Sequence, residues 1–192
     1  MTSNKNDDDD DFDWRTEVKS IPNLISLTRI AATPAIAYCI VEHHTQAALI
    51  GCFLAGASDF LDGYLAKHYD MATTLGTYLD PIGDKITINV LSVSLWYNGT
   101  LPGLLVGIWL GKDMAMVIGT YRKVSEGYYK PLKVNPTLTS KINTTLQFAT
   151  LGVGIVHPAF PETLDALCWI TGATTLASGL GYMQRSAFTN VK

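Results

Sequence analysis

Residues 59–67 read DFLDGYLAK and residues 76–85 read GTYLDPIGDK, and these two stretches decide the interpretation of the whole chain. They place four aspartates in an otherwise apolar region: Asp59, Asp62, Asp80 and Asp84. On helices, the first two aspartates, three residues apart, share one face, and the last two, four apart, share another. Two helices that face each other would bring all four carboxylates together. Because ionised carboxylates at membrane depth need cations to neutralise them, the pattern predicts a site for hard divalent ions, Mg²⁺ or Mn²⁺.

Small residues accompany the carboxylates at helical spacing. Gly63 and Ala66 share the face of the first two aspartates, and Gly76 precedes Asp80 by four residues. Bare backbone beside a pair of metal ions suits a nucleotide diphosphate. The alternative is that Asp62-Gly63 marks a turn in a loop between two membrane helices. We favour helices, because a loop does not explain two carboxylates at helical spacing on each side.

The two stretches resemble the signature of the CDP-alcohol phosphatidyltransferase family, D-x-x-D-G-x-x-A-R-x8-G-x3-D-x3-D. The matching positions, with the spacing intact, are Asp59, Asp62, Gly63, Ala66, Gly76, Asp80 and Asp84. One position departs from the signature, because Lys67 stands where the family has arginine. The charge is kept but the bidentate fork is lost, so we expect a looser grip on a phosphate or a neighbouring carboxylate.

Flanking segments extend the resemblance over nearly everything from residue 21 onward. Residues 22–29, PNLISLTR, are similar to the opening P-N-x-[LI]-[TS]-x-[ST]-R of the family's phosphatidylglycerophosphate and cardiolipin synthases. Residues 111–113, GKD, resemble their G-R-D, and Ser140-Lys141 matches their S-K. The closing residues 174–182, TTLASGLGY, are most similar to the mitochondrial-type, CMP-forming cardiolipin synthases.

The resemblance implies a reaction and a set of site residues. The reaction would transfer phosphatidyl from CDP-diacylglycerol to phosphatidylglycerol, with two Mg²⁺ or Mn²⁺ ions held by Asp59, Asp62, Asp80 and Asp84. Asp84 would also be the catalytic general base. The residues implied to bind CDP-diacylglycerol are Asn23, Asp59, Asp62, Gly63, Ala66, Lys67 and Gly76. Those implied to bind the acceptor's phosphate are Arg29, Lys112 and Lys141.

These basic residues also have a purely structural interpretation. Arg29 and Lys141 could extend to the lipid headgroups instead of binding substrate. Lys112 lies midway along an apolar run, where such extension is costly, although its neighbour Asp113 could pair with it.

Two other functions compete with cardiolipin synthesis. The nearer alternative is a phosphatidylglycerophosphate synthase that uses glycerol-3-phosphate with the same metals and donor. The more remote alternative is a divalent-cation carrier whose carboxylates line a path through the membrane. Glycine and alanine at fixed spacing argue against a carrier, and CMP release would separate the two classes.

The composition predicts one all-α integral membrane domain over residues 21–192, preceded by an acidic segment at 1–20. The chain has 192 residues, 47% hydrophobic and 16% charged, with a mean hydropathy of +0.17. The run Asp7–Asp11 predicts a solvated tail, followed by a short interfacial helix around Phe12, Trp14 and Val18. An acidic start does not fit a mitochondrial transit peptide, so we expect any presequence to be missing from this chain. The net charge of -3 gives no reason to expect a nucleic-acid partner.

Six apolar runs are long enough to cross a bilayer, at residues 21–41, 46–66, 75–97, 101–121, 140–156 and 164–183. The basic residues of the connections and termini all fall on one side of this arrangement: Arg15, Lys19, Lys67, Arg122, Lys123, Lys130, Lys133, Lys141, Arg185 and Lys192. By the positive-inside rule both termini and the aspartates lie on the inner side. The resemblance implies the mitochondrial inner membrane, with the site facing the matrix.

Small residues recur at helical spacing inside the apolar runs. The pairs are Gly51 and Ala55, Gly107 and Gly111, and Gly172 and Gly179. We expect close helix packing at these positions, with a homodimer interface as the second possibility.

Overall fold

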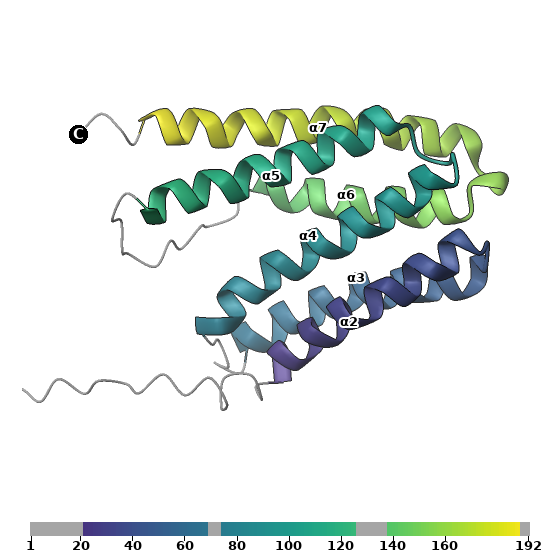
Figure 1. Ribbon diagram of the computed structural model, residues 1–192, viewed down its shortest axis with the longest axis horizontal. Helices are drawn as coiled ribbons and strands as arrows, with labels where there is room; N and C mark the ends of the chain where they lie inside the picture. Colours follow the sequence, from purple (N-terminus) through teal and green to yellow (C-terminus); the bar gives the residue numbers. More distant parts are fainter. Residues whose placement is uncertain (1–20, 69–73, 126–137, 189–192) are drawn as a thin grey trace, which may run out of the picture.

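The computed structural model describes residues 21–68, 74–125 and 138–188, and every long element in these ranges is a helix (Figure 1). The elements are α2 (Ile21–Val41), α3 (Thr45–His68), α4 (Thr74–Tyr97), α5 (Gly103–Ser125), α6 (Leu138–Ile155), the short 3-10 helix η1 (His157–Ala159) and α7 (Pro161–Phe188). The described ranges contain no strand. The all-helical prediction is therefore confirmed, whereas the acidic tail and its interfacial helix at 1–20 lie outside the described residues.

The six long helices match the six predicted apolar runs, with differences at the polar ends. Helix α5 continues to Ser125, beyond the apolar run that ends near residue 121. Helix α7 starts at Pro161, three residues before the expected start, because proline is well suited to the first turn of a helix. Apolar runs in a sequence indicate only the buried or lipid-facing part of a helix. The polar ends of a helix are therefore missed.

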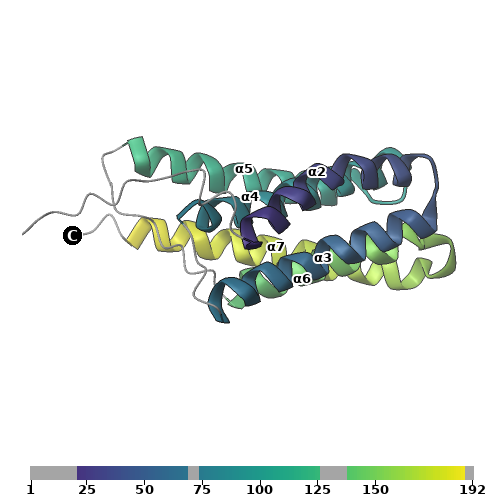
Figure 2. The same cartoon turned by 90° about the horizontal axis from the view of Figure 1, so that it is seen from below.

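Helix α4 packs between α2 and α5, and α3 also packs directly against α6 beside it (Figures 1 and 2). On one side α2 packs against both α3 and α4. On the other side α4 contacts α5 and α6, and α7 packs against both of these. Along α4, one face therefore packs against α2 and another against α5 and α6.

The connections between helices alternate between the two ends of the bundle. The connections at residues 42–44, 98–102 and 156–160 all lie at one end (Figure 1). The opposite end collects the starts of α2, α4 and α6 and the ends of α3, α5 and α7. The two aspartate pairs lie toward this second end, which is the end that the sequence assigns to the inner side.

Polarity is reversed relative to a water-soluble bundle. Large apolar side chains point outward, with Phe53 73% exposed, Leu104 79% and Trp169 82%. Polar side chains such as Arg29 and Asn143 are buried beside an apolar core around Leu91 and Trp109. An apolar exterior of this extent marks contact with lipid or another protein.

By length and composition, one described helix meets the requirements for crossing a membrane, over Asn23–Val41 with a mean hydropathy of 1.7. No other stretch of the described residues meets the same requirements. The six-span arrangement stays a prediction.

Glycines allow close helix contacts at some of the expected positions. A side chain at Gly51 would meet Ile36 of α2, and one at Gly172 would meet Leu105 of α5. The prediction of close packing is confirmed at these two positions. It is wrong for Gly107 and Gly111, because no described atom lies within 4 Å of a Cβ built on either residue.

Candidate active site

The signature residues lie on two helices joined by a short connection. Residues 59–67 belong to the last turns of α3, and residues 76–85 belong to the first turns of α4. Asp59 and Asp62 are thus on consecutive turns of one helix, and Asp80 and Asp84 on consecutive turns of the next. The alternative that the Asp62-Gly63 pair forms a loop is wrong.

Arg29 of α2 joins the two aspartate helices. Its side chain is 1% exposed, and its Nη1 donates a hydrogen bond to Oδ1 of Asp59 at 2.9 Å. The same nitrogen forms an ion pair with Oδ1 of Asp84. One guanidinium group therefore holds a carboxylate from α3 and a carboxylate from α4.

Buried polar residues precede and follow Arg29 along α2. One turn after it, the Thr33 hydroxyl lies 2.8 Å from the Arg29 carbonyl oxygen and 3.0 Å from the Thr87 hydroxyl of α4. One and two turns before it, Ser26 and Asn23 are buried. A continuous polar stripe on α2 therefore faces α3 and α4, and it includes Asn23, which the family resemblance assigns to donor binding.

Asp59 and Asp84 fit a divalent-ion site, because carboxylates from two helices converge on one cation-binding position. Oxygen ligands of this kind suit Mg²⁺ or Mn²⁺. Apart from this pair, the predicted ligands and donor-binding residues lie outside the described side chains: Asp62, Gly63, Ala66, Lys67, Gly76 and Asp80. The described part of the chain holds no group of three or more His, Cys, Asp and Glu side chains arranged for a metal.

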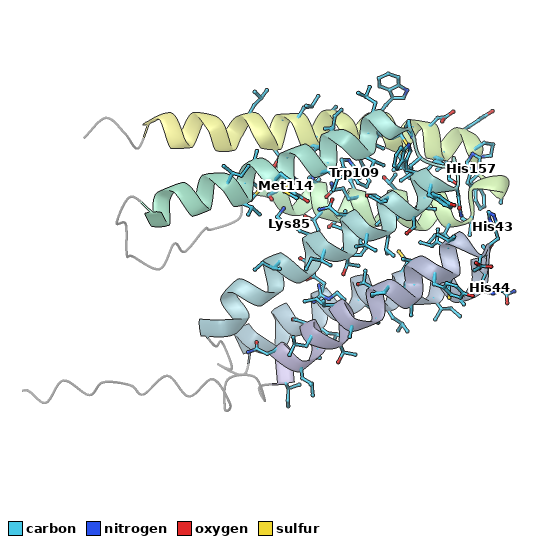
Figure 3. The ribbon with its side chains drawn as sticks, in the orientation of Figure 1. His43, His44, Lys85, Trp109, Met114 and His157 are labelled. Carbon is cyan, nitrogen blue, oxygen red and sulfur yellow. The ribbon has the colours of Figure 1, made fainter. Side chains whose placement is uncertain are left out.

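A second charged group lies on the other side of α4. Lys85 forms an ion pair with Oδ1 of Asp113 on α5, and Asn89 Nδ2 donates to Oδ2 of Asp113 at 3.1 Å. The Lys112 Nζ lies 3.8 Å from Oδ1 of Asp113, and the side chains of both are 8% exposed. Figure 3 shows Lys85 between α4 and α5, below Trp109.

This group explains why Lys112 can lie deep in the bundle. The proposed pairing of Lys112 with Asp113 is confirmed, but Asp113 serves two ammonium groups. The sequence analysis missed Lys85 and Asn89, although a lysine one turn before an asparagine inside an apolar run is itself a signal. Lys141 lies outside the described side chains. The structure places Arg29 against carboxylates, and its predicted role in binding the acceptor's phosphate stays a prediction.

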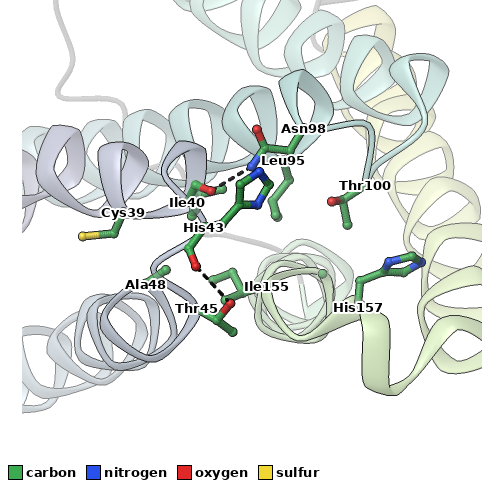
Figure 4. A pocket seen from close by; sticks show the side chains of 11 residues that line it. Cys39, Ile40, His43, Thr45, Ala48, Leu95, Asn98, Thr100, Ile155 and His157 are labelled. Atoms are coloured by element: carbon green, nitrogen blue, oxygen red, sulfur yellow. Dashed lines mark hydrogen bonds between the residues drawn. The ribbon is translucent and has the colours of Figure 1, made fainter.

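A pocket lies at the opposite end of the bundle, where the three tight connections meet (Figure 4). Polar residues on its wall include His43, Asn98 and His157. Asn98 Nδ2 donates to the carbonyl oxygen of Ile40 at 2.7 Å, which ties α4 to the end of α2. No carboxylate lines this pocket, and the aspartates of the signature lie toward the other end (Figures 1 and 4). The predicted metal ligands are therefore not part of this pocket.

Comparison with known proteins agrees with the site. The family model described as CDP-alcohol phosphatidyltransferase matches residues 19–177. This chain belongs to the CDP-alcohol phosphatidyltransferase family.

Similar proteins include two cardiolipin synthases. A protein of Schizosaccharomyces pombe named cardiolipin synthase (CMP-forming) / mitochondrial hydrolase fusion protein is 32% identical, over 92% of this chain and 33% of its own length. The cardiolipin synthase (CMP-forming) of Homo sapiens is 32% identical, over 85% of this chain and 60% of its own. A chloroplastic CDP-diacylglycerol–glycerol-3-phosphate 3-phosphatidyltransferase of Oryza sativa subsp. japonica is also 32% identical, over 88% of this chain and 57% of its own. The chain thus spans between 33% and 60% of the length of these relatives.

Proposed function

We propose that the protein is a CMP-forming cardiolipin synthase, which transfers the phosphatidyl group of CDP-diacylglycerol to phosphatidylglycerol. The observation that carries the proposal is the convergence of Asp59 and Asp84, from α3 and α4, on one cationic group. The likeness to proteins named cardiolipin synthase from Schizosaccharomyces pombe, Drosophila melanogaster and Homo sapiens supports the choice of product.

The donor would bind on the α2–α3 side of α4. Asp59, Asp62, Asp80 and Asp84 would hold two divalent ions, Mg²⁺ or Mn²⁺, and Asn23, Gly63, Ala66, Lys67 and Gly76 would line the site of the nucleotide. When bound, the ions would neutralise the diphosphate and the charge that develops on the leaving CMP. The buried polar stripe of α2 supports this side as the place of a polar substrate.

Asp84 would act as the general base. One of its oxygens would accept the proton from the attacking hydroxyl of phosphatidylglycerol. The hydroxyl oxygen of phosphatidylglycerol would form a bond to the phosphorus of the phosphatidyl group, and the bond from this phosphorus to the bridging oxygen of CMP would break. The products are cardiolipin and CMP, and the proton would leave from Asp84 to solvent. Asp84 belongs to the charged group of Arg29, and its neighbour Lys85 belongs to the charged group of Asp113, which supports this role.

The acceptor's phosphate would bind to basic residues, Arg29, Lys112 and Lys141. Burial of Lys112 supports this, because an ammonium group that is kept inside an apolar bundle serves an anion or a structural partner. Because Lys112 and Lys85 share the single carboxylate of Asp113, one positive charge remains to bind the acceptor's phosphate.

The protein would lie in the mitochondrial inner membrane with its site facing the matrix and with all six long helices spanning the bilayer. The apolar exterior and polar interior support the spans. A homodimer is a further possibility, and the exposed Gly107 and Gly111 on α5 would permit a close helix contact between copies.

A phosphatidylglycerophosphate synthase is the second candidate, and the 32% identity to the rice protein favours keeping it. A divalent-cation carrier is the third and more remote candidate.

The test is to incubate the purified protein in detergent with Mg²⁺, labelled CDP-diacylglycerol and one acceptor at a time. Cardiolipin from phosphatidylglycerol supports the proposal. Phosphatidylglycerophosphate from glycerol-3-phosphate, with no cardiolipin, would replace it with the second candidate, and the absence of CMP with every acceptor would reject both enzymes.

A further inference from the structure

Five buried side-chain atoms on α4, α5, α6 and α7 have no hydrogen-bond partner among the described residues. They are Asn89 Oδ1, Trp109 Nε1, Asn143 Nδ2, Gln147 Nε2 and Ser178 Oγ. Four of their residues are nearly or fully enclosed, since Trp109, Asn143, Gln147 and Ser178 are no more than 4% exposed. Buried polar groups are nearly always paired, so five such atoms on four helices that pack together call for an explanation.

Contacts between helices show that these atoms lie in one region. Asn89 and Asp113 are hydrogen-bonded across α4 and α5, and Trp109 lies one turn before Asp113. On α7, a Cβ at Gly179 would lie 3.7 Å from Cγ of Lys112, and Ser178 precedes this glycine.

The contact of α6 with α7 completes the region. Asn143 Oδ1 accepts hydrogen bonds from the hydroxyls of Thr174 and Thr175, at 2.9 and 2.8 Å. Gln147 follows Asn143 by one turn on the same face of α6. We name this region the buried polar cluster and define it by Lys85, Asn89, Trp109, Lys112, Asp113, Asn143, Gln147 and Ser178.

The buried polar cluster lies at a similar height along the bundle to Asp84, on the opposite side of α4 from Arg29. Gly154 of α6 packs against Leu95 of α4, where a Cβ on the glycine would lie 3.1 Å from Cδ1 of the leucine. Helices α4 and α6 run in the same direction (Figure 1). Counting eleven residues back from this contact on each helix (154 − 11 = 143 and 95 − 11 = 84) reaches Asn143 and Asp84, which therefore lie at a similar height.

The chemistry of the cluster matches one kind of ligand. Two ammonium groups, Lys85 and Lys112, share the single carboxylate of Asp113, which leaves one positive charge for an anion. The unpartnered atoms are mostly N–H donors from amides and an indole, together with one hydroxyl and one amide oxygen. A ligand with one negative charge and several oxygens satisfies both requirements.

We propose that the buried polar cluster binds the glycerol-phosphate headgroup of the acceptor, with Gln147 and Ser178 as residues that determine acceptor specificity. This inference rests on the proposed function. It adds residues of α4, α5, α6 and α7 to the three basic residues of the proposed acceptor site. The phosphodiester binds to the ammonium groups of Lys85 and Lys112. The glycerol oxygens accept hydrogen bonds from Asn143 and Gln147, and Ser178 pairs with a hydroxyl of the same headgroup. The bound headgroup then lies at a similar height along the bundle to Asp84.

Two variants test the inference, each with a matched control on the same helix. Gln147→Met keeps the size of the side chain and removes its amide, and Ser178→Ala removes one hydroxyl. The controls are Thr150→Val on α6 and Thr171→Val on α7. Both threonines are fully buried, but their hydroxyls donate to carbonyl oxygens of their own helices, those of Leu146 and Leu167.

The probe is glycerophosphoglycerol, the water-soluble headgroup of phosphatidylglycerol without its acyl chains. Its dissociation constant is measured directly by calorimetry on the full chain in detergent with Mg²⁺, and the KM values for phosphatidylglycerol and CDP-diacylglycerol are measured in parallel. We expect the dissociation constant to rise about tenfold in Gln147→Met and severalfold in Ser178→Ala, as loss of one hydrogen bond predicts. In both variants the KM for CDP-diacylglycerol should stay within about twofold of wild type. In the two control variants all three measured constants should stay within the same range.

A melting experiment separates ligand binding from a structural role. Because Gln147→Met removes a buried amide that has an unpartnered N–H, the ligand-free variant should melt at the same temperature as wild type or higher. A lower melting temperature with equal losses for both substrates would overturn the inference, as would unchanged binding of glycerophosphoglycerol in both variants. If wild type forms cardiolipin but neither variant changes probe binding or the KM for phosphatidylglycerol, the proposed role of the cluster is wrong and the proposed reaction stands. Binding of the probe without cardiolipin formation refutes the proposed reaction and leaves the cluster standing.

Discussion

Asp84 and Lys85 are neighbours in the sequence, yet they face opposite parts of the bundle. Asp84 faces α2, where it shares the guanidinium of Arg29 with Asp59 of α3. Lys85 faces α5, where it shares the carboxylate of Asp113 with Lys112. The first group has two acids and one base, and the second has two bases and one acid, so over these described side chains their net charges are -1 and +1.

The difference suggests a division of labour across α4. A group with excess negative charge attracts divalent cations and, through them, a diphosphate. A group with excess positive charge, buried in an apolar bundle, attracts an anion directly. Donor and acceptor would thus approach Asp84 from opposite sides of one helix, which suits a transfer reaction between two lipids. Four experiments test whether the two charged groups have these separate roles.

Removal of divalent ions should have the largest effect on turnover, and it should act only on the group formed by Arg29, Asp59 and Asp84. In excess chelator we expect turnover to fall to background, because the diphosphate is no longer neutralised, and we expect Mg²⁺ or Mn²⁺ to restore it. The measurement is CMP release before and after ion addition. Binding of glycerophosphoglycerol should persist in chelator. Activity that survives excess chelator would contradict the metal site.

Asp84→Asn should lower kcat by roughly 10²- to 10⁴-fold, the range for loss of a general base. Binding of CDP-diacylglycerol should be retained, since three carboxylates remain to hold the ions. Release of labelled CMP and equilibrium binding of the donor measure the two effects. Asp165→Asn, an exposed carboxylate of α7, is the control. If Asp84→Asn loses donor binding completely, its role is to hold metal and not to take the proton.

Arg29→Met should destabilise the protein by roughly 2–4 kcal/mol in chelator, because it leaves partly buried Asp59 and Asp84 without their shared cation. Divalent ions bound to the same carboxylates should reduce this loss. Arg29→Lys should recover part of the stability. Denaturant unfolding in detergent, with and without Mg²⁺, makes the measurement, and a loss that is equal in both conditions would show that Arg29 stabilises something other than this pair.

Lys85→Met should raise the KM for phosphatidylglycerol roughly tenfold, as expected for one charge-assisted hydrogen bond, and leave the KM for CDP-diacylglycerol unchanged. Lys85→Arg should restore much of the affinity for the acceptor. Steady-state kinetics with each substrate varied in turn gives the comparison. An equal rise in both KM values would mean that α4 does not separate the two substrates.

The sequence predicted what depends on local spacing. Helices α3 and α4, and the positions of the aspartates on successive turns of each, follow from residues three and four apart. The pairing of Lys112 with Asp113 also followed, because the two are adjacent.

The sequence could not predict what depends on how one helix is rotated against another. The ion pair of Lys85 with Asp113 needs the register of α4 against α5, and the contact of Arg29 with Asp59 and Asp84 needs that of α2 against two helices. Asn143, Gln147 and Ser178 are common helix residues whose importance appears only once they are buried. A partial signal was available, because Asn143 and Gln147 recur at a spacing of four inside an apolar run.

The most direct test of a shared divalent-ion site between α3 and α4 is a crystal structure with Mn²⁺ and a CDP-alcohol, recorded at a wavelength where manganese scatters anomalously. We predict anomalous peaks between α3 and α4 within coordination distance of Asp59 and Asp84, with the diphosphate bound to the same ions. Anomalous peaks only at other places in the molecule, or a nucleotide bound away from these two aspartates, would contradict it.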